Sequence, residues 1–457
     1  MKNSDPQHLR TEGDINISPA RTAWQSGITD EATRNWLEKD SRYFLHQSLS
    51  TPCLDVLGTA QGSSIRNLAG KDYLDFHGNN VHQLGYANAF LLDRVKAQLD
   101  ELAFSPRRFT NIPAINLAER LVGLTNGVLS RSLFAPGGTS AMSMALKLAR
   151  IATGRYKTIS LYDAFHGASM DSISVGGEYL FSRQVGPLLP GSIHVPPPDS
   201  YRGMWYDQHR PDGDLPYADY IEYVIEKEGD IGAIVAETIR STVVQVPSKA
   251  YWQRIRELCN RHGILLILDE VPVCMGRTGT HFAYQQFGIE PDILVIGKGL
   301  GAGLVPMAAL LCRETLNVAG HVSLGHFTHE KNPLGSAAAL AALDYMDQHQ
   351  TLQQVKTQEA YLRQKLNALK DQCPVIGDVR GLGMLWGIEL VEDRTTKKPA
   401  VQLAEQVLYA CLEAGLSLKV SGGNVLSLYP PLVISQAELD RALGILQSAL
   451  EASWQTS

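Results

Sequence analysis

The sequence lacks several features that would mark a membrane, nucleic-acid-binding or disulfide-rich protein. No apolar run approaches the roughly 20 residues of a membrane span, and the net charge of −6 leaves no basic excess for nucleic acid. The six cysteines are scattered without a C-x-x-C pair, so we predict free thiols and no metal site. The N-terminus also lacks the apolar core of a signal peptide. We therefore expect a cytoplasmic protein without nucleic-acid or membrane partners.

Two short aliphatic runs near the middle of the chain carry the main signal. Ile264–Leu268 and Ile293–Ile296 have the length and composition of strands buried on both faces of a parallel sheet. Asp269 follows the first run directly, and Lys298 follows the second after one glycine. The carboxyl ends of parallel strands form the ligand crevice of an open α/β sheet, so both side chains can project into one site.

An amine and a carboxylate in one crevice are what a pyridoxal phosphate enzyme needs. The lysine bonds to the cofactor aldehyde, and the carboxylate pairs with the pyridine nitrogen. Each residue alone could be an ordinary solvated position after a strand. The Gly297–Gly303 run also suggests a nucleotide loop, but it opens no long helix and contains no Gly-Lys-Ser/Thr sequence.

A second glycine-rich segment, residues 134–140, leads into a predicted helix over 141–150 that Gly154 ends. Gly138 and Thr139 lie where backbone N–H groups and the positive end of the helix dipole can bind phosphate. The alternative is a tight turn in which Ser or Thr caps the helix. Two further predicted strands, 157–162 and 231–236, lead to Phe165-His166-Gly167 and to Glu237.

These motifs together resemble a known family. Asp269-Glu-Val, Gly276-Arg-Thr-Gly, Phe282-Ala, Phe287-Gly, Pro291-Asp and Lys298-Gly-Leu are similar to the signature of class III (ω-type) aminotransferases, which are fold-type I pyridoxal phosphate enzymes. The resemblance runs from about residue 65 to the C-terminus. It implies an α/β fold, with a large domain built on a mostly parallel seven-stranded sheet flanked by helices and a smaller α+β domain. It also implies a homodimer with active sites at the interface.

The resemblance divides the chain into an N-terminal arm with part of the small domain (1–80), a large cofactor-binding domain (81–332) and a C-terminal small domain (333–457). It makes Lys298 and Asp269 catalytic. It implies that Phe165 and Val271 sandwich the cofactor ring, and that Thr328 reaches the phosphate in the partner subunit. The predicted cofactor contacts are Gly138, Thr139, Phe165, His166, Glu237, Asp269, Val271, Lys298 and Thr328.

Departures from the family pattern bear on the reaction. Ser427 stands three residues before Pro430-Pro-Leu, where many members have the arginine that binds a substrate carboxylate. Pro272 replaces a glutamine near the cofactor, and Glu330-Lys331 replaces a glycine pair. With these changes the chain resembles the family's elimination enzymes, which act on small amino alcohols bearing phosphate or phosphonate.

We accordingly expect a lyase that releases ammonia from a phosphonate-bearing amino alcohol, such as (R)-1-hydroxy-2-aminoethylphosphonate, to give phosphonoacetaldehyde. Arg107, Arg108 and Arg240 are candidates for binding the phosphonate, although each could be an ordinary surface arginine. One alternative is an aminotransferase that moves an amino group from an ω-amine or amino acid to a keto acid. Another is a non-catalytic relative, against which the retention of both Asp269 and Lys298 argues.

Overall fold

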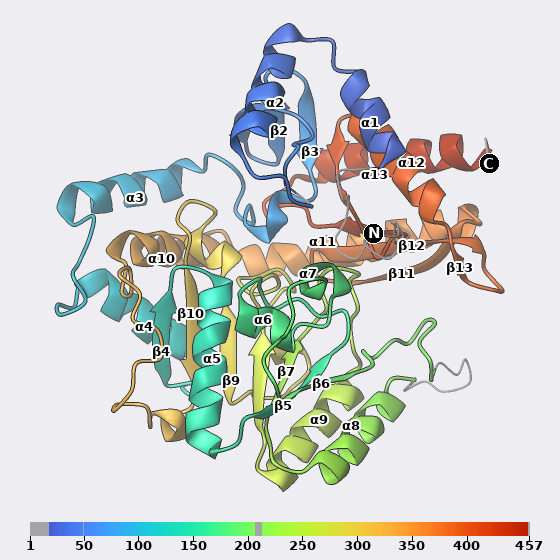
Figure 1. The fold of residues 1–457 in the computed structure, drawn as a ribbon. Coiled ribbons are helices and arrows are strands. Elements are labelled where there is room, and N and C mark those ends of the chain that lie inside the picture. Colours follow the sequence, from blue (N-terminus) through green and yellow to red (C-terminus); the bar gives the residue numbers. More distant parts are fainter. Residues whose placement is uncertain (1–17, 49, 206–212, 456–457) are drawn as a thin grey trace.

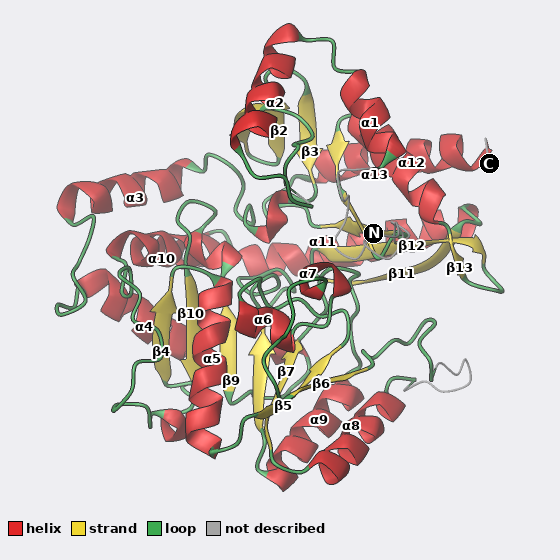
Figure 2. Cartoon of the chain, viewed as in Figure 1, coloured by secondary structure: helices red, strands yellow, loops and turns green. Residues whose placement is uncertain are grey.

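A computed structural model describes residues 18–48, 50–205 and 213–455. A seven-stranded sheet with helices on both faces forms the larger part of the molecule (Figures 1 and 2). Its strand order is β4 (Arg131–Ala135), β10 (Ala308–Cys312), β9 (Ile293–Ile296), β8 (Leu265–Asp269), β7 (Ile231–Glu237), β5 (Lys157–Leu161) and β6 (Ser192–Val195). All neighbours are parallel except β10, which runs antiparallel to β4 and β9. The predicted mostly parallel sheet of seven strands is confirmed.

The central strands are buried on both faces, as their continuous aliphatic runs predict. Along β8, Ile267 packs into the core on one side of the sheet, while Leu266 and Leu268 pack into the core on the other side. The first side is covered by α5 (Gly138–Thr153). The second side packs against α4 (Ile112–Leu124), α8 (Leu215–Glu228), α9 (Lys249–His262) and α10 (Pro333–Gln348), with α3 (Ala89–Glu101) lying against α10.

A separate hydrophobic core joins the N-terminal strands to the C-terminal part of the chain. One sheet has the order β1 (Leu57–Gln61), β2 (Ser64–Asn67), β3 (Asp72–Asp75) and β14 (Leu416–Ser417). The other contains β11 (Ile376–Leu382), β12 (Leu385–Asp393), β16 (Val425–Leu428) and β15 (Lys419–Ser421), with β13 (Lys398–Pro399) beside β12. Helices α11 (Thr351–Gln372), α12 (Val401–Glu413) and α13 (Gln436–Gln455) pack with these sheets.

The N-terminal region is described in part. Helices α1 (Pro19–Ser26) and α2 (Glu31–Tyr43) precede the first sheet, and residues 1–17 of the predicted arm lie outside the described residues. Strands β2 and β3 pair antiparallel and form a hairpin around Ala69-Gly70. Buried residues of α10 belong to the core of the large sheet, and the domain boundaries themselves stay predictions.

No helix in the described part of the chain is long and apolar enough to span a bilayer. The cytoplasmic location stays a prediction.

Candidate active site

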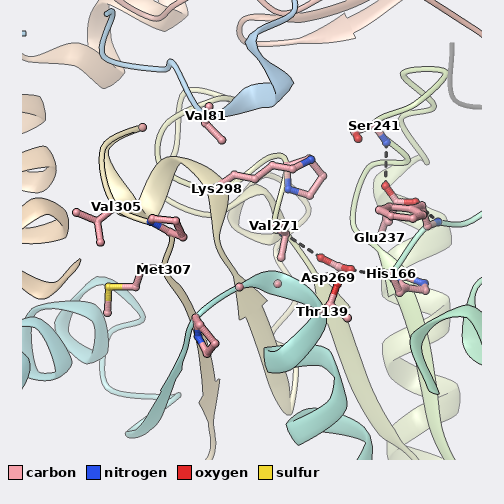
Figure 3. A pocket seen from close by; sticks show the side chains of 18 of the residues that line it. Val81, Thr139, His166, Glu237, Ser241, Asp269, Val271, Lys298, Val305 and Met307 are labelled. Carbon is pink, nitrogen blue, oxygen red and sulfur yellow. Dashed lines mark hydrogen bonds and ion pairs between the residues drawn. The ribbon is translucent and has the colours of Figure 1, made fainter. Parts of the chain in front are cut away.

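A cavity of about 490 Å³ lies at the carboxyl ends of the parallel strands (Figure 3). This volume is typical of a small-molecule site. The predicted residues that line it are Gly138, Thr139, Phe165, His166, Glu237, Asp269, Val271 and Lys298. They come from four separate strand ends and the start of α5, so the fold brings together side chains that are far apart in the sequence.

Lys298 is held in an unusual backbone conformation at the end of β9. Its φ of 46° lies in the left-handed region, where a non-glycine residue is strained. The next position must stay open, because a Cβ on Gly299 would lie 2.4 Å from Oε1 of Gln83. Lys298 is the first residue of the short helix Lys298–Gly301, and the other residues of this helix are buried. The helix therefore fixes the lysine at the cavity wall.

Asp269 is oriented by two hydrogen bonds. Its Oδ1 accepts from the backbone N–H of Val271 at 3.0 Å, and its Oδ2 lies 2.9 Å from Nδ1 of His166. Burial alone would lower the pKa of His166, but the hydrogen bond to Asp269, with the charges of Asp269 and Glu237, outweighs burial and raises it. The Val271 N–H and the His166 ring therefore hold the Asp269 carboxylate in one orientation.

Glu237 links two loops at the edge of this cavity. Its Oε1 accepts from the backbone N–H of Phe165 at 3.2 Å, and its Oε2 accepts from the N–H of Ser241 at 3.1 Å. Burial raises the pKa of Glu237; the charge of His166 opposes this rise, and that of Asp269 adds to it. The carboxylate thus fixes the loop that follows β5 against the turn that follows β7.

The N-terminus of α5 faces the cavity without a side-chain cap. Its N-cap residue is Gly137, in extended conformation, and no side chain caps the helix. The alternative of a Ser or Thr cap is therefore wrong. A Cβ on Gly138 would lie 3.0 Å from a methyl group of Val271, so the backbone approaches this residue closely. Backbone N–H groups left without a cap at a helix N-terminus suit an anion such as phosphate.

These features fit pyridoxal phosphate. The cavity offers an anion site at α5, a buried carboxylate for a pyridine nitrogen and a lysine amine for an aldehyde. Phe165 and Val271 both line the cavity, and the ring of Phe165 also packs against Phe181 at 4.6 Å between centroids. The sandwich of a cofactor ring between Phe165 and Val271 stays a prediction.

The remaining predicted residues lie outside this cavity. Thr328 is exposed on the loop before α10, so its reach toward a partner subunit stays a prediction. Arg107 and Arg108 lie in the exposed loop between α3 and α4, and Arg107 Nη1 lies 2.6 Å from Nδ1 of His326. Arg240 lines a neighbouring cavity.

Sequence reasoning missed part of the wall. Val81, the Ser241–Thr242 pair and residues 303–307 also line the cavity. Ser241 and Thr242 follow the end of β7 within a few residues, and this position was a signal that could have identified them. Ser427 is fully buried on β16 and donates to the carbonyl of Thr242 at 2.9 Å. This hydrogen bond supports the part of the cavity wall that contains Thr242. The hydroxyl of Ser427 points to the protein and not into the cavity.

Comparison with known proteins now assigns the family. Residues 47–450 match the model described as aminotransferase class III, and the chain belongs to this family. The chain is 53% identical to (R)-1-hydroxy-2-aminoethylphosphonate ammonia-lyase of Vibrio splendidus (strain 12B01), over 97% of this chain and 95% of the relative. It is 31% identical to isoleucine 2-epimerase of Lentilactobacillus buchneri, over 93% and 96% of the two chains.

Solved structures agree on the fold. An amine transaminase from an uncultivated Pseudomonas species, in its PLP-bound form, is 32% identical and has a TM-score of 0.84, covering 91% of this chain and 98% of that one. An (S)-enantioselective omega-transaminase from Thermomicrobium roseum is 30% identical, with a TM-score of 0.85 over 92% and 98% of the two chains. The expected fold-type I architecture is confirmed.

Proposed function

We propose that the protein is a pyridoxal phosphate-dependent ammonia-lyase. Its substrate is a phosphonate-bearing amino alcohol such as (R)-1-hydroxy-2-aminoethylphosphonate, and its products are phosphonoacetaldehyde and ammonia. The observation that carries this proposal is the 53% identity to a lyase of that name over nearly the full length of both chains. The buried serine at position 427 supports it, because a serine hydroxyl cannot replace the forked guanidinium that binds a keto-acid carboxylate.

The cofactor is part of the proposal. The α5 N-terminus at Gly138 and Thr139 would hold the phosphate, and Asp269 would pair with the pyridine nitrogen. When bound, pyridoxal phosphate acts as an electron sink that makes the carbon beside the substrate amine acidic. His166 orients Asp269 through the contact at 2.9 Å, and Glu237 keeps the surrounding loops in place.

Lys298 is the base that this arrangement supplies. Its amine lies on the cavity wall and can take a proton from the amine-bearing carbon of the substrate. The hydroxyl on the neighbouring carbon then takes this proton from Lys298 and leaves as water, and a carbon–carbon double bond forms between the two carbons. The enamine is hydrolysed after release, which consumes one water and yields the aldehyde and ammonia. The overall change is the loss of one ammonia, with water balanced.

We further propose a homodimer in which Thr328 completes the partner's site. The exposure of Thr328 outside the cavity of its own chain supports this arrangement. Such an interface would be isologous, so each subunit would give and receive the same contact.

The first prediction separates elimination from transamination. We expect the holoenzyme to release ammonia catalytically from (R)-1-hydroxy-2-aminoethylphosphonate in the absence of any keto acid, because elimination consumes no amino acceptor. The measurement is ammonia and aldehyde release over many turnovers, with the Lys298→Ala variant as control, which we expect to lose at least about a thousandfold in rate. A strict requirement for pyruvate or 2-oxoglutarate would identify an aminotransferase instead.

A further inference from the structure

We call the cavity of the candidate active site the cofactor cavity. A second cavity, of about 300 Å³, adjoins it. Thr242 lines both cavities, so the turn that carries this residue lies between them. The lining of the second cavity is rich in charge: its basic residues are Arg202, Arg240 and Arg380, and its acidic residues are Asp163, Glu178, Asp199 and Glu389. We call it the arginine cavity.

Two of the three arginines are committed to the protein. Arg380 donates through Nε to the carbonyl oxygens of Val243 and Val244, at 3.2 and 3.0 Å, and through Nη1 to Glu389 at 2.7 Å. Arg202 pairs with Glu389 at 2.8 Å. Glu389 is buried, so both arginines are held by a carboxylate that cannot exchange its partners for water.

Arg240 differs from both. Its ion pair is with Asp163, at 3.8 Å, which is beyond hydrogen-bond distance. The Asp163 side chain is 52% exposed, whereas that of Arg240 is only 13% exposed. Nε of Arg240 is buried and has no hydrogen-bond partner among the described residues. A guanidinium shielded from water, with an unsatisfied donor and a loosely held counter-ion, is suited to bind an incoming anion.

The backbone presents Arg240 rigidly beside the cofactor cavity. Arg240 and Gln245 exchange backbone hydrogen bonds of 3.1 and 2.9 Å, which closes the turn that carries Thr242. The hydroxyl of Ser427, on β16, donates to the carbonyl of Thr242 and holds the turn from the side of that strand. The turn is therefore fixed on both sides, and it holds Arg240 in the lining of the arginine cavity next to Thr242, which borders both cavities.

We propose that Arg240 binds the phosphonate group of the substrate from the arginine cavity. This inference rests on the proposed function. The basic side chains that line the cofactor cavity are Lys298 and His166; Lys298 serves as the base, and His166 is paired with Asp269. A phosphonate dianion therefore needs a cation from outside that lining. Arg240 lines the arginine cavity together with Thr242, which also lines the cofactor cavity, whereas Arg107 contacts His326 in an exposed loop.

The test uses the holoenzymes of wild type, Arg240→Gln and Arg240→Lys. The substrates are the hydroxyaminoethylphosphonate and ethanolamine, in which hydrogen replaces the phosphonate. We expect Arg240→Gln to raise the KM for the phosphonate roughly 10- to 100-fold, because a charge-assisted contact is lost. Arg240→Lys keeps the charge without the fork and should fall in between. The rate with ethanolamine, however low, should be the same in all three enzymes.

Further variants provide a control and test the other candidate arginines. Arg150→Gln removes an exposed arginine on α5 and should change nothing. Arg107→Gln and Arg108→Gln test the other two candidates. Asp163→Asn removes the counter-ion that competes with the ligand, so it should lower the KM for the phosphonate or leave it unchanged. Methylphosphonate should inhibit the wild type competitively, with an inhibition constant at least about tenfold higher in Arg240→Gln.

The outcomes distinguish the inference from the proposed function. If the wild type releases ammonia while Arg240→Gln keeps its KM and its inhibition by methylphosphonate, the inference is overturned and the function stands. A raised KM in Arg107→Gln or Arg108→Gln alone would overturn it as well. If Arg240→Gln loses cofactor absorbance or thermal stability, the KM values of Arg240→Lys and Asp163→Asn for the phosphonate test the inference instead. If the wild type releases no ammonia, the function fails, and calorimetric binding of methylphosphonate still tests Arg240.

Discussion

Three ionisable side chains, His166, Glu237 and Asp269, share the buried side of the cofactor cavity. Each carboxylate accepts two hydrogen bonds, and Asp269 Oδ2 meets His166 Nδ1 at 2.9 Å. The His166 side chain is buried, so its raised pKa reflects the contact with the Asp269 carboxylate. At the scale of single residues, a histidine orients one carboxylate of the site while another carboxylate fixes the loops.

This contact predicts a stability that depends on pH. The pKa of His166 is raised on folding, so its protonated form stabilises the fold fully below the unfolded value of about 6.5, and this contribution is lost as pH rises through the folded pKa. We expect His166→Gln to lower the unfolding free energy most at acidic pH. The difference from wild type should shrink at up to about 1.4 kcal/mol per pH unit above pH 6.5. The measurement is denaturant unfolding of the cofactor-free protein from about pH 5.5 to about pH 9.

His194 is the matched control for this prediction. Burial lowers its pKa, although the carbonyl of Gly176 accepts a hydrogen bond from its ring at 2.9 Å. Its folded state disfavours the proton, so its effect has the opposite sign: His194→Gln should relieve a cost that is present at acidic pH and absent above the unfolded pKa. Equal pH dependence in the two variants would contradict the role given to the Asp269 contact.

At the scale of elements, α5 has two ends with different tasks. Its N-terminus at Gly138 meets Val271 in the cavity wall, and its C-terminus ends at Gly154 in left-handed conformation, with φ of 66°. The first end places backbone N–H groups for an anion, and the second end only terminates the helix. A substitution at each end should therefore affect a different property.

We predict that Gly138→Ala weakens cofactor binding by roughly tenfold, because the new Cβ would lie 3.0 Å from a stiff, β-branched Val271 and displace the helix start. Gly154→Ala should instead destabilise the fold by about 1 kcal/mol and leave cofactor affinity unchanged. The measurements are titration of the apoprotein with pyridoxal phosphate and thermal unfolding. Unchanged cofactor affinity in Gly138→Ala would show that this glycine only terminates a turn.

The sequence could predict the strand ends but not everything that meets there. Continuous aliphatic runs placed Asp269 and Lys298 at neighbouring strand ends, because burial on both faces leaves such a run few other structures. The bonds from Phe165 and Ser241 to Glu237 were not predictable, since they join loops whose geometry depends on tertiary packing. The arginine cavity was not predictable for the same reason: Arg240 and Arg380 approach each other only when the two cores pack together.

At the scale of the whole molecule, a buried arginine links the two cores. Arg277 is fully buried and donates through Nη1 to the carbonyl of Met384 at 3.1 Å and to that of Pro430. Burial lowers the pKa of Arg277 to about 9.

Val81, which follows the N-terminal sheet, reaches the cavity from above in Figure 3. The cofactor cavity thus takes its floor from the large sheet and part of its roof from the segment after β3.

The proposed dimer makes a prediction that would fail if each chain formed a complete site by itself. Lys298→Ala and Thr328→Ala each remove one part of a site, and in a mixed dimer both losses fall on the same site. The other site then has Lys298 from one subunit and Thr328 from its partner, both intact. For random pairing we expect roughly a quarter of all sites to be complete. Because Thr328 is exposed, its substitution should not disturb the fold of its own chain.

The measurement is ammonia release at limiting pyridoxal phosphate, where a weakened phosphate site costs most activity. The Lys298→Ala dimer should be inactive, and the Thr328→Ala dimer should need more cofactor for half-maximal activity. Subunits mixed by unfolding and refolding together should recover high-affinity activity that neither parent shows. If the mixture only averages the two parents, Thr328 acts within its own subunit or not at all, and the interface does not complete the site.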